Sequence, residues 1–170
     1  GGMASVGIPS YRLPKDVLKA DGEDIVRELG GQFFFGRLLG RDFSVDDLMA
    51  KGYDAAFLAY GASQGGALGI HNEDQELAGY VSGIEFLDGV HRRVELGEDF
   101  DFGGDVTGDV VVVGGGNVAM DCVRSALRLG ARSVHLVYRR TRADMPADVL
   151  EVEAAEKEGV IFHCLVNPSA

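Results

Sequence analysis

The chain has 170 residues, a length typical of one domain or of two small ones. Hydrophobic residues make up 46% and charged residues 25%, as in soluble globular proteins, and no apolar run approaches the roughly 20 residues of a membrane helix. The net charge of −11 argues against a general affinity for nucleic acids or anionic membranes.

The cysteines and histidines form no ligand motif. Cys122 and Cys164 lack the spacing of a metal site or redox pair, so we expect reduced, buried thiols in a cytoplasmic protein. The four histidines show no metal-ligand spacing, and no metal site is expected.

The first part of the chain alternates predicted helices and strands. Residues 15–30 carry apolar side chains near helical spacing, and Ser44 with Asp47 forms a helix cap. Residues 31–36 (GQFFFG) and 54–60 (DAAFLAY) are predicted as short strands, the first of them buried. Alternation of this kind predicts a parallel sheet covered by helices.

The middle of the chain is rich in turns. A short helix is predicted over residues 81–90. Residues 97–109 are acidic and glycine-rich without periodicity, which is typical of a surface connection between domains.

The last part of the chain reads as β-α-β-α-β, which is half of a doubly wound sheet. The predicted elements are a strand at 110–113, a helix at 117–129, a strand at 134–138, a helix after Pro146 ending at Glu158, and a strand at 160–166. The first strand consists of four valines, which predicts burial on both faces of a parallel sheet.

A glycine motif joins the four-valine strand to the next helix. Gly114, Gly116 and Ala119 match the pattern G-x-G-x-x-G/A, with Gly115 inside the turn. The first glycine permits the tight turn, the second leaves room for a pyrophosphate, and the small third residue lets the helix pack on the strand. Free N–H groups at the helix start would face the phosphates. The motif predicts nucleotide binding; the alternative is a glycine turn that serves packing alone.

Two arginines follow the second strand of this unit. A carboxylate there would bind the ribose 2′-hydroxyl of NAD and repel a 2′-phosphate. This strand ends instead in Arg139 and Arg140, and the first acid is Asp144. Guanidinium groups suit a phosphate dianion, so the sequence favours NADPH. The alternative is that one or both arginines point to solvent or pair with a neighbouring acid.

Several segments together resemble one family. They are GIPSYRLPKDVL at 7–18, GYDAAFLAYGA at 52–62, GIHNED at 69–74, GGGNVAMDCVRSALRLGA at 114–131 and YRRTRADMP at 138–146. In this order they resemble the small (beta) subunit of NADPH-dependent glutamate synthase, and also the flavin segment of dihydropyrimidine dehydrogenase.

The resemblance implies an oxidoreductase that carries FAD, takes hydride from NADPH and passes electrons to iron–sulphur centres or a partner subunit. It also implies an α/β fold with Rossmann-like parallel sheets and two partial dinucleotide-binding domains. Residues 1–75 would be part of the FAD domain, 76–109 an interdomain crossing, and 110–170 part of the NADPH domain.

The resemblance also assigns site residues. Tyr60 stands where that family has Thr in an Ala-Thr-Gly turn near FAD, a departure that affects the local flavin contact. The residues implied on the flavin side are Ile8, Pro9, Tyr11, Arg12, Leu13, Pro14 and Gly61. The alternative for Tyr11 and Leu13 is packing at the entry of the first helix. The residues implied in the NADPH phosphate loop are Gly114, Gly115, Gly116, Asn117, Val118 and Ala119, with Arg139 and Arg140 at the 2′-phosphate.

The FAD fingerprint of that family is not found in this sequence. We therefore expect an internal segment of a longer flavoprotein, with an incomplete FAD site and no activity alone. No general acid or base stands out, as expected where two cofactors exchange hydride. The alternative is a nucleotide-binding or regulatory module without redox activity.

Overall fold

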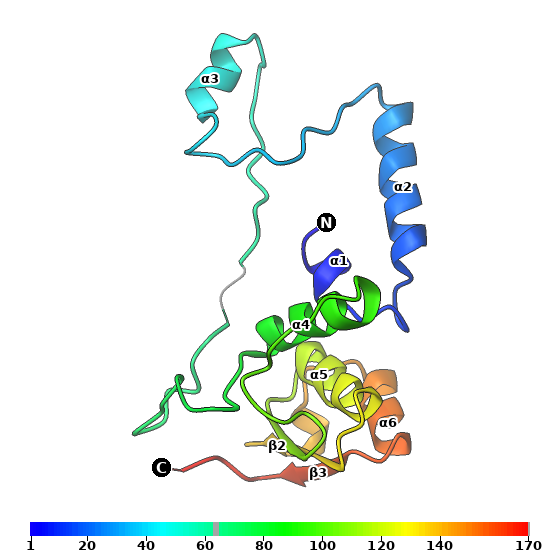
Figure 1. Ribbon diagram of the computed structural model, residues 1–170, viewed down its shortest axis with the longest axis vertical. Coiled ribbons are helices and arrows are strands. Elements are labelled where there is room, and N and C mark those ends of the chain that lie inside the picture. Colours follow the sequence, from blue (N-terminus) through cyan, green and yellow to red (C-terminus); the bar gives the residue numbers. More distant parts are fainter. Residues whose placement is uncertain (63–64, 170) are drawn as a thin grey trace. The chain divides into compact units, whose positions relative to one another are not determined.

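The computed structural model describes residues 1–62 and 65–169 (Figure 1). The chain forms two compact units, one made of Gly1–Pro14 with Ser63–Ala170 and the other of Lys15–Ala62. The predicted division into FAD domain, crossing and NADPH domain concerns cofactors and stays a prediction.

The first unit contains a three-stranded parallel sheet in the order β1-β2-β3. Its elements are β1 (Asp109–Val113), α5 (Asn117–Arg128), β2 (Ser133–Tyr138), the short 3-10 helix η1 (Arg142–Asp144), α6 (Val149–Lys157) and β3 (Ile161–Cys164). Val113 pairs with Val137, so the carboxyl ends of β1 and β2 lie at the same edge of the sheet. The predicted β-α-β-α-β order is confirmed.

The core of this unit lies between α5 and the sheet. Met120, Val123 and Ala126 are fully buried and recur every three residues, which keeps them on one helix face. They belong to one cluster with Val134 and Leu136 of the central strand. This packing fixes the start of α5 against the ends of the strands.

Two further helices belong to this unit, α1 (Met3–Val6) and α4 (Gly83–Glu95), which lie beside each other (Figure 1). The Ser82 hydroxyl accepts a hydrogen bond from the Glu85 N–H and caps α4. Phe86 and Leu87 bury the apolar face of α4. The helix predicted over residues 81–90 is confirmed, and it extends five residues further.

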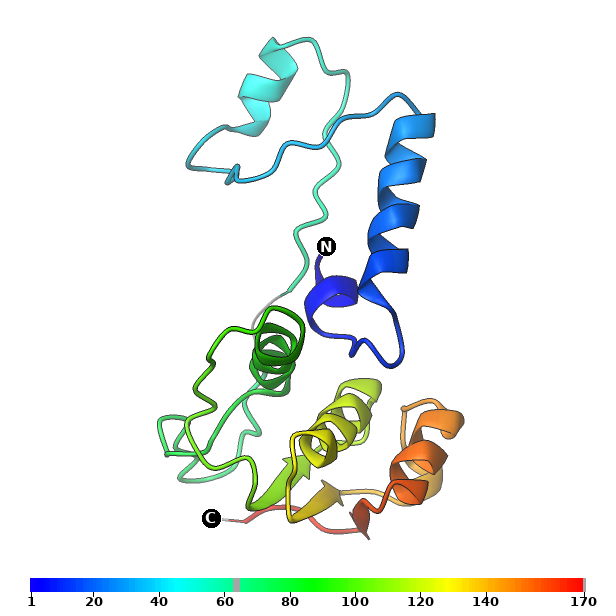
Figure 2. The ribbon, with the colours of Figure 1, turned by 45° about the vertical axis from the view of Figure 1, so that its right-hand side comes forward.

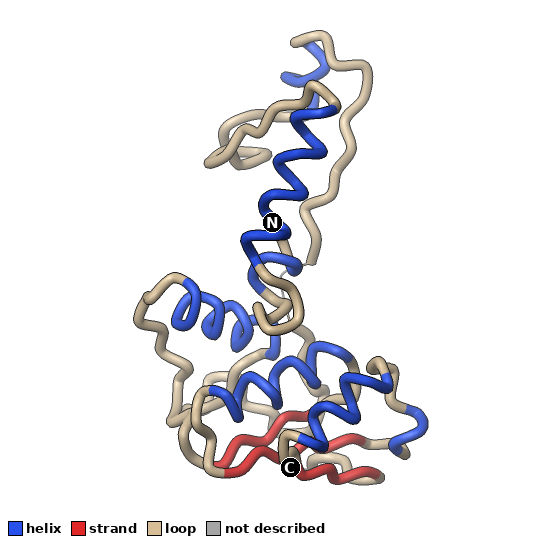
Figure 3. The backbone as a smooth tube through the Cα atoms, turned by 90° about the vertical axis from the view of Figure 1, so that its right-hand side faces the viewer, coloured by secondary structure: helices blue, strands red, loops and turns tan. Residues whose placement is uncertain are grey.

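The prediction that β1 is buried on both faces is wrong. Val111 is 61% exposed, whereas Val110 and Val112 pack against the core. Right-handed crossovers place the helices between successive parallel strands on one face, and Figure 3 shows α5 and α6 there together. The opposite face carries His135 and His163, whose ring nitrogens lie 2.9 Å apart.

The prediction of a surface connection over residues 97–109 is also wrong in part. Phe102 is buried against Phe86 of α4, with ring centroids 5.3 Å apart, and Phe100 contacts Phe102 edge to face. The acidic and glycine residues of this stretch predicted exposure, but two aromatic side chains between them pack under α4 and complete the core there.

The second unit contains α2 (Lys15–Glu28) and α3 (Val45–Ala50), joined by extended loops (Figure 2). The predicted cap is present, because Ser44 and Asp47 form a reciprocal capping box. The strands predicted at 31–36 and 54–60 are not formed, and Phe34 and Phe57 are exposed. A strand exists through ladder hydrogen bonds to a neighbour, and neither stretch has one among the described residues.

In the described part of the chain, no helix combines the length and the apolar character that crossing a membrane requires.

Candidate functional site

The turn between β1 and α5 is shaped by three consecutive glycines. Gly114 has φ +148°, a conformation that favours glycine, and a β-carbon there would lie 3.4 Å from that of Ala119. A β-carbon on Gly115 would lie 2.5 Å from the Tyr138 ring. At Gly116 it would meet nothing within 4 Å. Gly114 and Gly115 are therefore explained by backbone and packing, whereas Gly116 faces open space.

The N-terminus of α5 opens onto that space. Gly116 is its N-cap and supplies no side-chain hydrogen bond to the first N–H groups of the helix. Those groups carry the positive end of the helix dipole, and the helix has 12 residues. The combination of uncapped donors and free space suits an anionic group such as a pyrophosphate.

The remaining motif residues have separate structural roles. The Asn117 side-chain oxygen accepts a hydrogen bond of 2.9 Å from the Asp148 N–H, which ties the start of α6 to the start of α5. Ala119 is buried in the core, and Val118 is half exposed. The predicted phosphate loop, from Gly114 to Ala119, is thus one continuous feature at the carboxyl end of β1.

Arg139 and Arg140 follow β2 at the same edge of the sheet, and both are exposed. Within residues 1–62 and 65–169, neither guanidinium forms a hydrogen bond or an ion pair. Arg142 differs, because both of its terminal nitrogens bind Glu156 at 2.7 Å. In the described part of the chain, the charge of Arg140 acts on Asp144, but neither arginine side chain at this edge is held by a hydrogen bond or an ion pair.

The first acid after β2 is already engaged. The Asp144 carboxylate accepts hydrogen bonds from the Thr141 N–H at 3.1 Å and from the Thr141 hydroxyl at 2.6 Å. The Thr141 hydrogen bonds lower the pKa of Asp144, so it stays ionised while it caps η1. Asp144 is therefore held in the chain's own turn rather than offered to a ribose hydroxyl.

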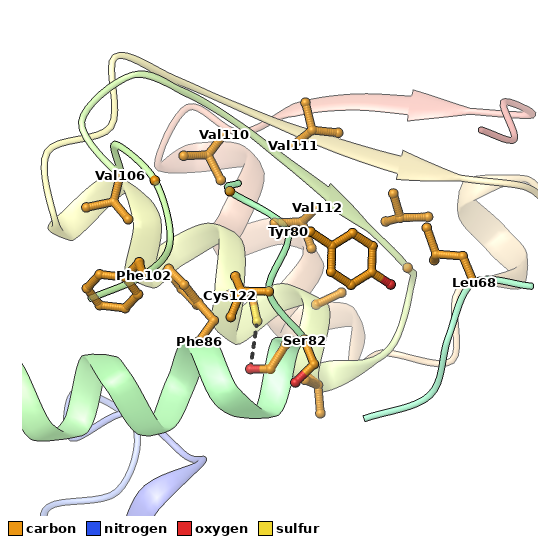
Figure 4. Close-up of a pocket in the computed structure, with 18 of the residues that line it drawn as sticks. Leu68, Tyr80, Ser82, Phe86, Phe102, Val106, Val110, Val111, Val112 and Cys122 are labelled. Atoms are coloured by element: carbon orange, nitrogen blue, oxygen red, sulfur yellow. Dashed lines mark hydrogen bonds between the residues drawn. The ribbon is translucent and has the colours of Figure 1, made fainter. Parts of the chain in front are cut away.

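A cavity of about 720 Å³ adjoins the phosphate loop within the first unit (Figure 4). Its wall is mostly apolar and comes from β1, from α4 and from residues 79–82, with Val112, Phe86 and Tyr80 among the lining side chains. The polar lining includes Ser82 and Asn117. A volume of this size is in the range of ligand sites, which is about 300–1,000 Å³.

Cys122 lines the cavity but is not a reactive thiol. Its Sγ lies 3.5 Å from the Gly83 carbonyl oxygen, to which it donates, and burial raises the pKa of Cys122 to about 12. The thiolate is the nucleophilic form, so this cysteine stays neutral at ordinary pH. Both cysteines are free, and Cys122 is buried as predicted; the prediction that Cys164 is buried is wrong, because its side chain in β3 is only partly covered.

The segment implied on the flavin side lies in the same unit as the phosphate loop. Ile8, Pro9 and Leu13 are partly buried. The Arg12 side chain binds Asp121 of α5 and Glu151 of α6. Gly61, with φ +71°, belongs to the second unit. Flavin contacts at these residues stay predictions.

A network of charged side chains on α5 and α6 was missed by the sequence reasoning. Arg124 binds both Glu151 and Glu158, and Arg128 binds Glu158. Hydrogen bonds from Arg128 and Arg124 lower the pKa of Glu158 to about 2. The signal was the spacing of charges, since Asp121, Arg124 and Arg128 recur at three and four residues and share one helix face.

The glycine turn, the uncapped helix and the parallel strands together define a dinucleotide-binding α/β unit. The sequence profile of the family described as "Pyridine nucleotide-disulphide oxidoreductase" matches residues 36–170. The chain belongs to this family.

Known relatives resemble the chain over its whole length. It is 49% identical over 170 residues to the NADP(+)-dependent formate dehydrogenase subunit beta of Moorella thermoacetica, covering 100% of this chain and 23% of that relative. It is 39% identical over 171 residues to the glutamate synthase (NADPH) small chain of Escherichia coli K12, covering 99% of this chain and 35% of that relative. The resemblance to the glutamate synthase small subunit is confirmed, and the chain spans a minor part of each relative.

A solved structure confirms the fold class. FprA of Mycobacterium tuberculosis in complex with NADPH has a TM-score of 0.73 and 21% identity, covering 93% of this chain and 38% of that chain. The α/β, Rossmann-like class predicted from the sequence is therefore confirmed.

Proposed function

We propose that this chain is the part of an FAD-dependent oxidoreductase that receives NADPH and directs its hydride to the flavin. The observation that carries the proposal is the pair Arg139 and Arg140, both exposed after β2 and, among the described residues, without a side-chain hydrogen bond or ion pair. A 2′-phosphate would supply a negatively charged partner for these two guanidinium groups. When bound, the flavin accepts the hydride and stores its two electrons.

The phosphate loop has a distinct part in this proposal. N–H groups at the start of α5 would hold the pyrophosphate, and the missing side chain of Gly116 would let it approach. Gly114, Gly115 and Ala119 would shape the turn, while Asn117 and Val118 would border it. The arrangement orients the nucleotide and requires no general acid or base from the chain.

The flavin side is proposed from the resemblance, supported by the shared unit of residues 1–14 and the phosphate loop. Ile8, Pro9, Arg12 and Leu13 would border the flavin, and the resemblance also assigns Gly61 to the flavin side. The functional division would be an FAD part at 1–75, a crossing at 76–109 and an NADPH part at 110–170.

The electrons would pass onward to iron–sulphur centres or to a partner subunit. The relatives support this direction, because one is named as a formate dehydrogenase subunit and the other as a glutamate synthase chain. Proteins with different final reactions thus share this segment, which supports a role at the NADPH end of the electron path.

We also propose a cytoplasmic location, because free thiols such as the two cysteines of this chain persist in that compartment.

The proposal is tested by flavin reduction in the full-length protein that contains this chain. Under anaerobic conditions, we expect one equivalent of NADPH to bleach the visible flavin absorbance of one equivalent of bound FAD. NADH should be at least about tenfold less effective, because the arginines recognise only the 2′-phosphate.

Two outcomes would contradict the proposal. If the protein binds flavin but NADPH does not reduce it, the proposed hydride transfer is refuted. NADPH binding without any bound flavin would favour the alternative of a nucleotide-binding or regulatory module.

A further inference from the structure

The N-terminal segment is held to α5 by a partly buried ion pair. One Arg12 nitrogen, Nη1, lies 2.8 Å and 2.9 Å from the two carboxylate oxygens of Asp121, and Arg12 Nε lies 3.0 Å from Glu151 Oε1. Asp121 is 4% exposed. A partly buried contact between residues 109 positions apart fixes how the segment lies on α5 and α6.

Asp121 depends on Arg12 for compensation of its charge. Burial raises the pKa of Asp121, and the hydrogen bonds and charge of Arg12 act against that rise. Glu151 adds a like charge and Arg124 an opposite one, both with smaller effects than Arg12. Removing the Arg12 guanidinium would leave a buried carboxylate without its principal partner, which is strongly unfavourable.

A second contact orients the same segment. The Tyr11 ring centroid lies 3.9 Å from the guanidinium carbon of Arg128 and 4.7 Å from that of Arg124. Glu158 holds both arginines in place. Cation–π contacts from two fixed guanidinium groups restrict the rotation of the segment about the ion pair.

The ion pair lies close to the phosphate loop. Asp121 is on α5, little more than one turn after Gly116, where the pyrophosphate would bind. The same helix therefore carries the phosphate donors at its start and the anchor of the flavin-side segment one turn later. These contacts therefore join the segment implied on the flavin side to the helix that begins at the predicted phosphate loop.

We propose that Tyr11, Arg12, Asp121 and Glu151 form a clasp that sets the position of the flavin-side segment relative to bound NADPH, with Arg12 and Asp121 as positioning residues for hydride transfer. This inference rests on the proposed function. Hydride transfer depends steeply on the distance between donor and acceptor, and a displacement of about 1 Å can lower the rate about 100-fold.

The test is a double-mutant cycle in the full-length, flavin-loaded protein, using Arg12→Gln, Asp121→Asn and the double variant. Rapid-mixing kinetics over a range of NADPH concentrations give both the limiting rate of flavin reduction and the Kd of NADPH. Each single variant should lower the limiting rate at least about tenfold and change the Kd by less than about threefold. The double variant should be no slower than the slower single variant, because both remove one interaction.

The matched control is Arg132→Gln, which breaks an ion pair with Asp109 on the exposed surface and should leave the limiting rate unchanged. Single variants with wild-type rates would overturn the clasp, as would losses that multiply in the double variant. If Arg12→Gln does not fold, Arg12→Lys is compared with Arg132→Lys: a lower rate in the first alone supports the clasp, and equal rates overturn it. Failure of the wild-type protein to reduce its flavin would instead refute the proposed function.

Discussion

Gly116→Val is expected to weaken NADPH binding by at least about 100-fold, or roughly 2.7 kcal/mol. A β-carbon at this position meets no protein atom within 4 Å, so the folded chain can accommodate the side chain. The branched side chain would instead occupy the space that the pyrophosphate needs against the backbone. Isothermal titration calorimetry on the full-length protein measures the loss.

The adjacent position provides a matched control. A β-carbon at Gly115 would lie 2.5 Å from the Tyr138 ring, so Gly115→Ala should destabilise the fold, typically by about 1–3 kcal/mol. Circular dichroism and thermal unfolding should therefore show a change in Gly115→Ala and little change in Gly116→Val. A folded Gly116→Val variant with wild-type NADPH affinity would refute the proposed pyrophosphate site.

The second large effect is expected at the arginines that follow β2. Wild-type protein should bind NADPH at least about tenfold more tightly than NADH, equivalent to about 1.4 kcal/mol. Arg139→Ala and Arg140→Ala should each reduce NADPH affinity and leave NADH affinity nearly unchanged, because NADH lacks the 2′-phosphate. Titration of each variant with both nucleotides measures the selectivity.

Arg142→Ala is the control for these variants. Arg142 binds Glu156 through two hydrogen bonds of 2.7 Å, so its charge is already paired. We expect NADPH affinity to change by less than about threefold in this variant, as for other exposed ion pairs. Equal losses for NADPH and NADH in the Arg139 and Arg140 variants would contradict the 2′-phosphate assignment.

The glycine turn between β1 and α5 could be predicted from the sequence because its determinants are local. The glycine pattern, the valine strand before it and the apolar spacing of α5 are all read within about twenty residues, as is usual for this motif. The geometry added that Gly114 is required by its positive φ and Gly115 by the Tyr138 ring. Neither the backbone conformation nor the packing requires glycine at Gly116, and the sequence pattern alone does not show this difference among the three glycines.

Strand predictions were less secure, because a strand depends on its neighbours. Residues 54–60 have the composition of a buried strand, yet Phe57 is 94% exposed and no ladder forms there among the described residues. β1 does form, but Val111 is exposed because α5 and α6 cover the other face of the sheet. Composition indicates the tendency of a segment, whereas pairing and covering elements decide the outcome.

The clasp could not be predicted from the sequence. Arg12 precedes Asp121 by 109 positions, and no local pattern relates the two. Charges at helical spacing on α5 indicate a polar helix face, but a solvated face gives the same pattern. Only the packing of the N-terminal segment on that face shows which charges are buried.

A crystal structure of the full-length protein with NADPH is the most direct test of the proposed nucleotide site. The pyrophosphate should accept hydrogen bonds from N–H groups at the start of α5, with its oxygens over Gly116. The 2′-phosphate should contact the guanidinium group of Arg139 or Arg140. A nucleotide bound with its pyrophosphate away from Gly114–Ala119, or with its 2′-phosphate distant from both arginines, would contradict the account.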